Sequence, residues 1–223
     1  MVAAQQSSLP PGLNAVPTRE TTRTGHTALL LASRSPRRAE LLRTLGVAFR
    51  VLDVEVDETP TAGEAPDAYV RRLARDKARA GRAIVDSLPV LAADTTVVLD
   101  GAILGKPLDA ADARTMLARL AGCTHEVMTG VAVIDGRGSL RDTVLATRVT
   151  FRTLAPDEIA AYVASGEPLD KAGAYGIQGL GGALVARIEG SYSNVVGLPL
   201  AETLALLDAA GVPHALRAAD LQT

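Results

Sequence analysis

The alternation of short apolar runs with longer amphipathic stretches most limits how this chain can fold. It begins at Ala28, where the run ALLLA precedes a stretch from Arg37 to Leu45 with apolar residues at helical spacing, and it continues to about residue 210. Short apolar runs are typical of buried strands, and apolar residues every three or four positions are typical of helices. Strands and helices in alternation predict an α/β fold.

The composition permits a large core and excludes several function classes. Of the 223 residues, 48% are apolar and 22% are charged, which argues against global disorder. The net charge of -2 argues against nucleic-acid binding by bulk electrostatics. The one cysteine, Cys123, cannot form an intrachain disulfide and fits a reducing compartment. Because the sequence shows neither a signal peptide nor a run of roughly 20 apolar residues, we expect a cytoplasmic protein that binds no membrane.

The first 27 residues differ from the rest of the chain. They are rich in Pro, Ser, Thr and Gln and have no periodicity. Such a segment buries too little apolar surface to fold alone. We therefore expect a disordered N-terminal tail over residues 1–27, followed by a single domain over residues 28–223.

Turn and cap signals bound the expected elements. Asp100-Gly101 between apolar runs predicts a two-residue hairpin. Asp109 is placed to cap a short helix that ends at Gly122. The expected strands are 28–32, 49–56, 89–94, the hairpin 96–104, two strands around residue 136, and 182–190; the expected helices are 37–45, 66–87, 109–122, 156–166 and 199–210.

The first strand-to-helix turn carries positive charge in an unfavourable place. Ser35 suits the N-cap and Pro36 the first helical position, so Arg37 and Arg38 fall in the first turn. Each charge there costs roughly 0.3–1 kcal/mol against the helix dipole. A helix N-terminus after a strand, with the Ser33 hydroxyl beside it, suits a polyphosphate. The alternative is that the arginines point to solvent or pair with a carboxylate.

The helix expected at 66–87 places a lysine on its apolar face. Val70, Leu73, Lys77 and Ile84 fall on one stripe at helical spacing. An unpaired ammonium is costly among apolar neighbours. Lys77 therefore either snorkels to the surface or reaches a buried anion.

Two further residues, Asp94 and Gln178, have side chains suited to catalysis or ligand binding, but the sequence around each is weak evidence for such a role. Asp94 is expected at the carboxyl end of the buried strand 89–94, a position typical of metal ligands and bases but also of turn residues. Gln178 lies among glycines, which permit close backbone approach, and its amide offers a donor beside an acceptor.

Several linked segments together resemble one family. LASRSPRRAELL, VDE, RLARDKA, AADTTV, GKP, DKAGAYGIQG and IEGSYSNVVGLPL occur in the order seen in the Maf family of nucleotide pyrophosphatases. The resemblance extends over roughly Leu29 to Leu207, and the ordered set is far more specific than any one segment. GIQG and GSYSNVVGLPL are similar to the subgroup that acts on dTTP and UTP, whereas a sister subgroup prefers 7-methyl-GTP.

The resemblance implies a fold and a reaction. The fold would be a mixed, twisted sheet flanked by helices, with the active cleft at the strand ends, in a homodimer. The reaction would hydrolyse a nucleoside triphosphate to the monophosphate and pyrophosphate, as house-cleaning of the nucleotide pool. It would need a divalent cation, Mg²⁺ or Mn²⁺.

The resemblance also implies site residues. Asp94 would be the general base, although Asp94 and Glu58 could equally hold the metal that carries the attacking water, and the sequence does not separate these roles. The residues expected to neutralise the triphosphate are Lys77, Lys106, Ser33, Ser35 and Arg38. The residues that match specificity positions are Arg37, Thr95 and Gln178.

Two other functions stay open from the sequence. One is the same reaction on modified purine triphosphates such as 7-methyl-GTP. The other is a non-enzymatic regulator of cell division that only binds a nucleotide. A carboxylate next to a cluster of cations favours chemistry, because a pure binding module needs no base.

Overall fold

The computed structural model describes residues 27–85 and 87–217. The predicted tail lies outside them except for Thr27, so that prediction, like the exact limits of the domain, stays untested. No helix in these two ranges has the length and apolar character needed to cross a membrane.

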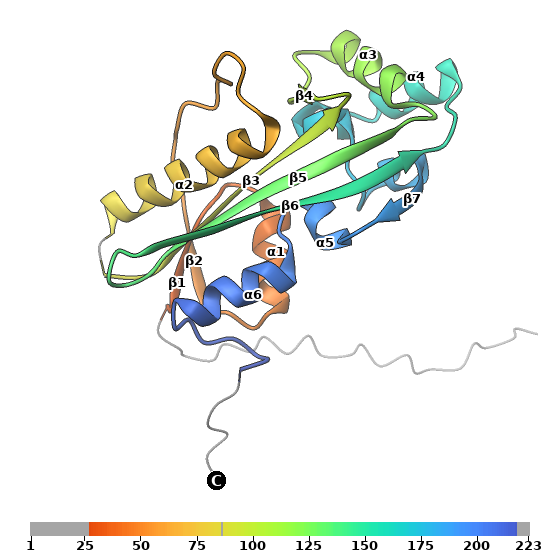
Figure 1. The fold of residues 1–223 in the computed structure, drawn as a ribbon. Helices are drawn as coiled ribbons and strands as arrows, with labels where there is room; N and C mark the ends of the chain where they lie inside the picture. The colour runs from red at the N-terminus through yellow and green to blue at the C-terminus, as the bar shows by residue number, and fades with distance from the viewer. Residues whose placement is uncertain (1–26, 86, 218–223) are drawn as a thin grey trace, which may run out of the picture.

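The described residues form a seven-stranded sheet in the order β2-β1-β3-β5-β6-β7, with β4 paired to β3 (Figure 1). β1 is parallel to both of its neighbours, and the other pairs are antiparallel. The sheet is therefore mixed, as expected. The strands are β1 (Leu29–Ala32), β2 (Phe49–Leu52), β3 (Val90–Leu99), β4 (Ala102–Leu104), β5 (Thr124–Ile134), β6 (Leu140–Phe151) and β7 (Val185–Glu189).

Helices cover both faces of this sheet, which confirms the predicted α/β class. Three short 3₁₀ segments accompany them. The helices are α1 (Pro36–Thr44), α2 (Pro66–Ile84), α3 (Ala110–Leu120), α4 (Pro156–Ala164), α5 (Tyr192–Val196) and α6 (Leu200–Ala209); the 3₁₀ segments are η1 (Glu167–Asp170), η2 (Ala172–Ala174) and η3 (Leu180–Leu184).

Alternation along β1 and β3 divides the core between the two faces. Even-numbered residues such as Leu30 and Ala92 pack with α2, whereas odd-numbered residues such as Leu29 and Leu91 pack with α1 and α6. Figure 1 shows α2 on one side of the sheet and α1 with α6 on the other. A third cluster joins the far half of β3 to α3 and α4 around Phe151. β3 thus extends from one core into another.

The local turn and cap predictions are confirmed. Asp100 and Gly101 both have positive φ, 51° and 78°, and connect β3 to β4 as a hairpin. The Asp109 carboxylate accepts hydrogen bonds from the amides of Ala111 and Asp112, at 2.8 Å each. Both features depend only on neighbouring residues, which explains why the sequence predicts them.

Three expectations about the elements are wrong. β3 is one continuous strand, so Asp94 lies in its middle and not at its carboxyl end. Asp-Thr-Thr resembles a turn locally, but β5 pairs with β3 through Asp94 opposite Gly130 and keeps it extended. β2 is shorter than the predicted strand 49–56 and ends at Leu52. Ile84 is expected on the apolar stripe of its helix, but it is 60% exposed, because it is the last residue of α2.

The topology leaves one edge of β3 open at its centre. On that side β1 pairs with β3 only at Val90 and Leu91, and β4 pairs with it only from Val97 to Leu99. Among the described residues, no strand occupies the interval between them. The carboxyl end of β1 and the start of α1 lie next to this interval, as expected for a cleft at strand ends, although Asp94 itself is not at one.

Candidate active site

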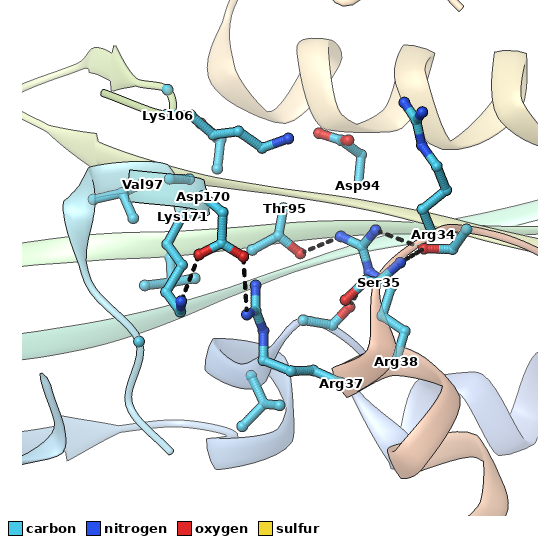
Figure 2. A pocket seen from close by; sticks show the side chains of 18 of the residues that line it. Arg34, Ser35, Arg37, Arg38, Asp94, Thr95, Val97, Lys106, Asp170 and Lys171 are labelled. Carbon is cyan, nitrogen blue, oxygen red and sulfur yellow. Dashed lines mark hydrogen bonds and ion pairs between the residues drawn. The ribbon is translucent and has the colours of Figure 1, made fainter. Parts of the chain in front are cut away.

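A cavity of about 620 Å³ lies at the open edge of β3. All ten side chains nominated from the sequence line it, together with other residues. Figure 2 shows Arg38, Asp94 and Lys106 among them. The ten are Ser33, Ser35, Arg37, Arg38, Glu58, Lys77, Asp94, Thr95, Lys106 and Gln178.

Lys77 lies between two carboxylates on the α2 side of β3. Its Nζ is 2.7 Å from Oδ1 of Asp94 and 2.6 Å from Oε1 of Glu58. The side chains of Lys77 and Asp94 are only 12% and 11% exposed. Of the two alternatives for Lys77, the structure therefore favours a buried anion over snorkelling, and the anion is a carboxylate of the chain itself.

A glycine allows this pair to form. Gly130 is opposite Asp94 on β5, and a Cβ there would collide with the backbone carbonyl of Val70 in α2. Because glycine lacks that atom, α2 can lie directly against the sheet. Lys77, two turns further along α2, then reaches Asp94.

The loop after β2 brings Glu58 into the cavity, and α2 fixes that loop. The Tyr69 hydroxyl donates to the Glu58 carbonyl at 2.9 Å, and the Arg72 guanidinium donates to the Thr59 carbonyl at 3.1 Å. Burial works to raise the pKa of Glu58, but the hydrogen bond and charge of Lys77 outweigh it, so the pKa lies below its usual value. Glu58 is therefore ionised at neutral pH.

Arg38 lies on the opposite face of β3 and is bound by neutral groups. Its Nε donates to the Gly197 carbonyl at 2.8 Å, and its terminal nitrogens donate to the hydroxyls of Thr95 at 2.9 Å and Ser33 at 3.3 Å. Burial lowers its pKa, while the charge of Asp94 acts in the opposite direction. Among the described residues, no carboxylate forms an ion pair with it. Arg38 thus contributes positive charge to the cavity in a fixed orientation.

The other arginine of this turn has a different partner. Arg37 is 3.9 Å from Oδ2 of Asp170, whose other oxygen is 2.6 Å from the ammonium of Lys171. Arg37 therefore pairs with a carboxylate, the alternative left open above. Ser35 occupies the N-cap position, but its side chain makes no capping hydrogen bond; instead, its amide donates to the Ser33 hydroxyl at 3.2 Å.

Lys106 and Gln178 enter the cavity from two loops of the α3 and α4 end. Figure 2 shows the Lys106 ammonium pointing toward Asp94. The Gly105 carbonyl beside it accepts from the Gly173 amide at 3.0 Å, which joins the two loops. Gln178 is exposed on the loop that precedes η3.

Sequence reasoning missed Tyr69, Asp170, Lys171 and Tyr175, which also line the cavity. Asp170 and Lys171 stand immediately before the glycine-rich loop, and this charged pair was the available signal. Burial and then the charges of Asp94 and Glu58 raise the pKa of Tyr69 to about 12, so its hydroxyl stays protonated and able to donate.

The donor set limits how a metal ion could bind. Within the described ranges, no group of three or more His, Cys, Asp or Glu side chains is arranged for a metal. The carboxylates of Asp94 and Glu58 do lie close together, because both contact Nζ of Lys77. Mg²⁺ in phosphate-handling sites is usually bound by one or two carboxylates, with substrate phosphates and water as the remaining ligands. The pair fits that arrangement.

The chain is similar in sequence to known proteins. Residues 28–210 match the family model described as Maf-like protein. The chain is 58% identical over 192 residues to a dTTP/UTP pyrophosphatase of Myxococcus xanthus (86% of this chain, 97% of the relative). It is 60% identical to one of Anaeromyxobacter (83% and 90%) and 58% identical to one of Escherichia coli O157:H7 (81% and 92%). The chain belongs to the Maf family.

Proposed function

We propose that this protein hydrolyses dTTP and UTP between the α and β phosphates, releasing the monophosphate and pyrophosphate. The observation that carries the proposal is the gathering of Lys77, Arg38 and Lys106 around the carboxylates of Asp94 and Glu58 in one cavity. The relatives named dTTP/UTP pyrophosphatase support the choice of substrate. The homodimer that the family resemblance implies and the cytoplasmic location expected from the sequence remain predictions.

Asp94 is suited to take the proton of the attacking water. One of its oxygens is occupied by Lys77, and in the described part of the chain the other has no hydrogen bond. The water oxygen bonds to the α phosphorus, its proton moves to the second oxygen of Asp94, and the bond from phosphorus to the bridging oxygen breaks. Pyrophosphate leaves with the electron pair of that bond.

Cations stabilise the charge that this step moves. Arg38 is fixed by three hydrogen bonds, so it needs no reorganisation when the transition state forms. Lys106 faces Asp94 across the cavity, where it can neutralise the leaving pyrophosphate. The Ser33 and Ser35 hydroxyls and the start of α1 supply further donors for phosphate oxygens.

In the alternative assignment, in which Asp94 is a metal ligand and not the base, Asp94 and Glu58 would hold a divalent cation, Mg²⁺ or Mn²⁺, together with the substrate phosphates. Such an ion lowers the pKa of bound water and neutralises phosphate charge. Glu58 is ionised at neutral pH, as metal ligation requires.

Base choice would depend on the loop of residues 176–181, here called the recognition loop. The Gln178 amide complements the imide edge of thymine or uracil: its oxygen accepts from the ring N–H, and its NH₂ donates to a ring carbonyl. Cytosine lacks that N–H, and adenine lacks the whole pattern. Arg37 and Thr95 match the other specificity positions on the same cavity wall.

The test is pyrophosphate release from dTTP, UTP, CTP, 7-methyl-GTP and ATP, each with Mg²⁺ or Mn²⁺. We expect strong release from dTTP and UTP alone. Equal turnover of UTP and CTP would contradict the role given to Gln178, and preference for 7-methyl-GTP would move the assignment to purines. If the folded protein releases pyrophosphate from none of these nucleotides, the result would favour a regulator that only binds nucleotides.

A further inference from the structure

One carboxylate that does not line the cavity holds the recognition loop. Oε1 of Glu167 accepts hydrogen bonds from the Tyr162 hydroxyl at 2.9 Å and the Gly181 amide at 3.1 Å, and Oε2 accepts from the Leu180 amide at 2.9 Å. Among the described residues, each oxygen of this carboxylate therefore has at least one donor. Two of the three donors are backbone amides of the recognition loop, those of Leu180 and Gly181.

The phenol of Tyr162 extends this attachment to the start of the loop. Its oxygen accepts from the Gly176 amide at 3.2 Å. A Cβ at Gly179 would collide with the Glu167 carboxylate, and one at Gly181 would collide with the Tyr162 hydroxyl. The glycines are therefore required for the loop to lie this close. Both ends of the loop are joined to one pair of side chains.

Glu167 acts from outside the cavity. The described residues that line the cavity include Gly176, Ile177 and Gln178, but not Glu167 or Tyr162. Burial works to raise the pKa of Glu167, but hydrogen bonds from the Gly181 and Leu180 amides outweigh it, so the pKa lies below its usual value. The carboxylate is therefore ionised at neutral pH, and both oxygens can accept.

We propose that Glu167 is a positioning residue for base recognition, which fixes the backbone of the recognition loop and thereby the place of the Gln178 amide. This inference rests on the proposed function, in which Gln178 contacts the base. A side-chain amide distinguishes two bases only when its donor and acceptor both meet hydrogen-bond geometry. A loop rich in glycine does not keep that geometry unaided, since glycine has the largest conformational freedom.

The test begins with Glu167→Gln, which keeps the size of the side chain. Glutamine has one acceptor oxygen where glutamate has two, so at least one amide of the loop loses its partner. We expect the ratio of kcat/KM for UTP over CTP to fall about tenfold, mainly through a higher KM for UTP. Tyr162→Phe, which removes the second contact, should act in the same direction if Glu167→Gln fails to fold.

A double-mutant cycle separates positioning from general destabilisation. If Glu167 acts through Gln178, Glu167→Gln adds no further loss of selectivity to a Gln178→Ala protein. Glu158→Gln is the matched control: this carboxylate, on the same α4–η1 segment, accepts from the Ala155 amide at 2.8 Å and pairs with Arg152 at 2.7 Å, and it does not line the cavity. It should behave as wild type.

The outcomes distinguish the inference from the function on which it rests. Additive losses, or a lower kcat with unchanged selectivity, would overturn the positioning role while leaving the reaction intact. If the wild type releases no pyrophosphate, the proposed function fails, and binding of UMP and CMP measured by calorimetry decides the inference. A preference for UMP that Glu167→Gln removes would then support it; equal weakening of both, or no preference in the wild type, would overturn it.

Discussion

The two ends of the cavity are built in different ways. At the phosphate end, Lys77, Asp94 and Arg38 are fixed by side-chain contacts between different segments of the chain. Helix α2 lies directly against the sheet there, at Gly130. At the base end, the exposed Gln178 belongs to a glycine-rich loop held mainly through backbone amides.

This difference separates chemistry from substrate choice. Charges fixed before the reaction stabilise a transition state without reorganisation, so small displacements at the phosphate end are expected to cost rate. A loop on a rigid scaffold can change without disturbing that end. Substitutions at the phosphate end should therefore lower kcat for every nucleotide, and those at the base end should alter the order of preference.

The largest expected effect is that of Asp94→Asn. The amide cannot take the proton of water, so turnover of dTTP should fall about 10³-fold. The measurement is pyrophosphate release with Mg²⁺, with unfolding by urea to verify the fold. A variant that keeps more than a tenth of wild-type activity would show that Asp94 is not the base, and a cellular effect that survives without turnover would support regulation by binding alone.

Lys77→Met is expected to have the next largest effect. Methionine keeps much of the buried stem but removes the charge, so turnover should fall about 10²-fold for all substrates alike. The pKa of Glu58 should rise, because Lys77 lowers it more than Lys106 and Arg38 do. The activity profile should consequently shift to higher pH.

A control on the same helix isolates the role of the buried ammonium. Arg79 is 59% exposed and pairs only with Asp76 among the described residues, at 3.1 Å. Arg79→Met removes a positive charge from α2 away from the cavity and should leave turnover unchanged. Equal activity of the two variants would mean that Lys77 serves packing alone.

His125 makes the stability of the fold depend on pH. It lies behind the base end, where its Nε2 is 2.8 Å from the Tyr175 hydroxyl and its ring packs edge-on against Phe151. Burial lowers its pKa to about 4 from an ordinary value near 6.5. Between these pH values the unfolded chain binds the proton and the folded chain does not, so the free energy of unfolding falls as pH falls.

The expected loss from this one group is about 3 kcal/mol between pH 7 and pH 4. Urea unfolding at steps of pH would measure it. His125→Phe, although less stable at neutral pH because Tyr175 loses its partner, should lose correspondingly less stability over the same interval. Parallel pH profiles for the two proteins would contradict a neutral, buried His125.

Local signals explain which parts of this structure the sequence predicts. The Asp100-Gly101 hairpin and the Asp109 cap depend on neighbouring residues. The central position of Asp94 in β3 does not, because it requires pairing with Gly130 on β5. The partner of Arg38 at Gly197 is similarly distant, 159 residues along the chain.

The site residues show the same division. The order of motifs was sufficient to nominate ten side chains, and all ten line one cavity. The contacts that orient them follow from tertiary packing. Tyr69 and Glu167 are examples, since each acts on a loop that only the folded chain brings to it. The sequence thus predicts the members of the site better than the groups that position them.

The smallest expected effect is that of Gln178→Glu. It tests the difference between the two ends most directly, because it should change the preference between UTP and CTP with little loss of kcat. In Gln178→Glu, the carboxylate accepts from the amino group of cytosine but repels the carbonyl oxygen that uracil presents at the same position. We expect kcat/KM to fall about tenfold for UTP and to rise for CTP, with kcat nearly unchanged. Competition between the two nucleotides in one reaction, read as UMP and CMP formed, gives this ratio directly. A parallel loss for both nucleotides would place Gln178 among the groups that support the phosphate end, and base choice would then have to come from Arg37 or Thr95.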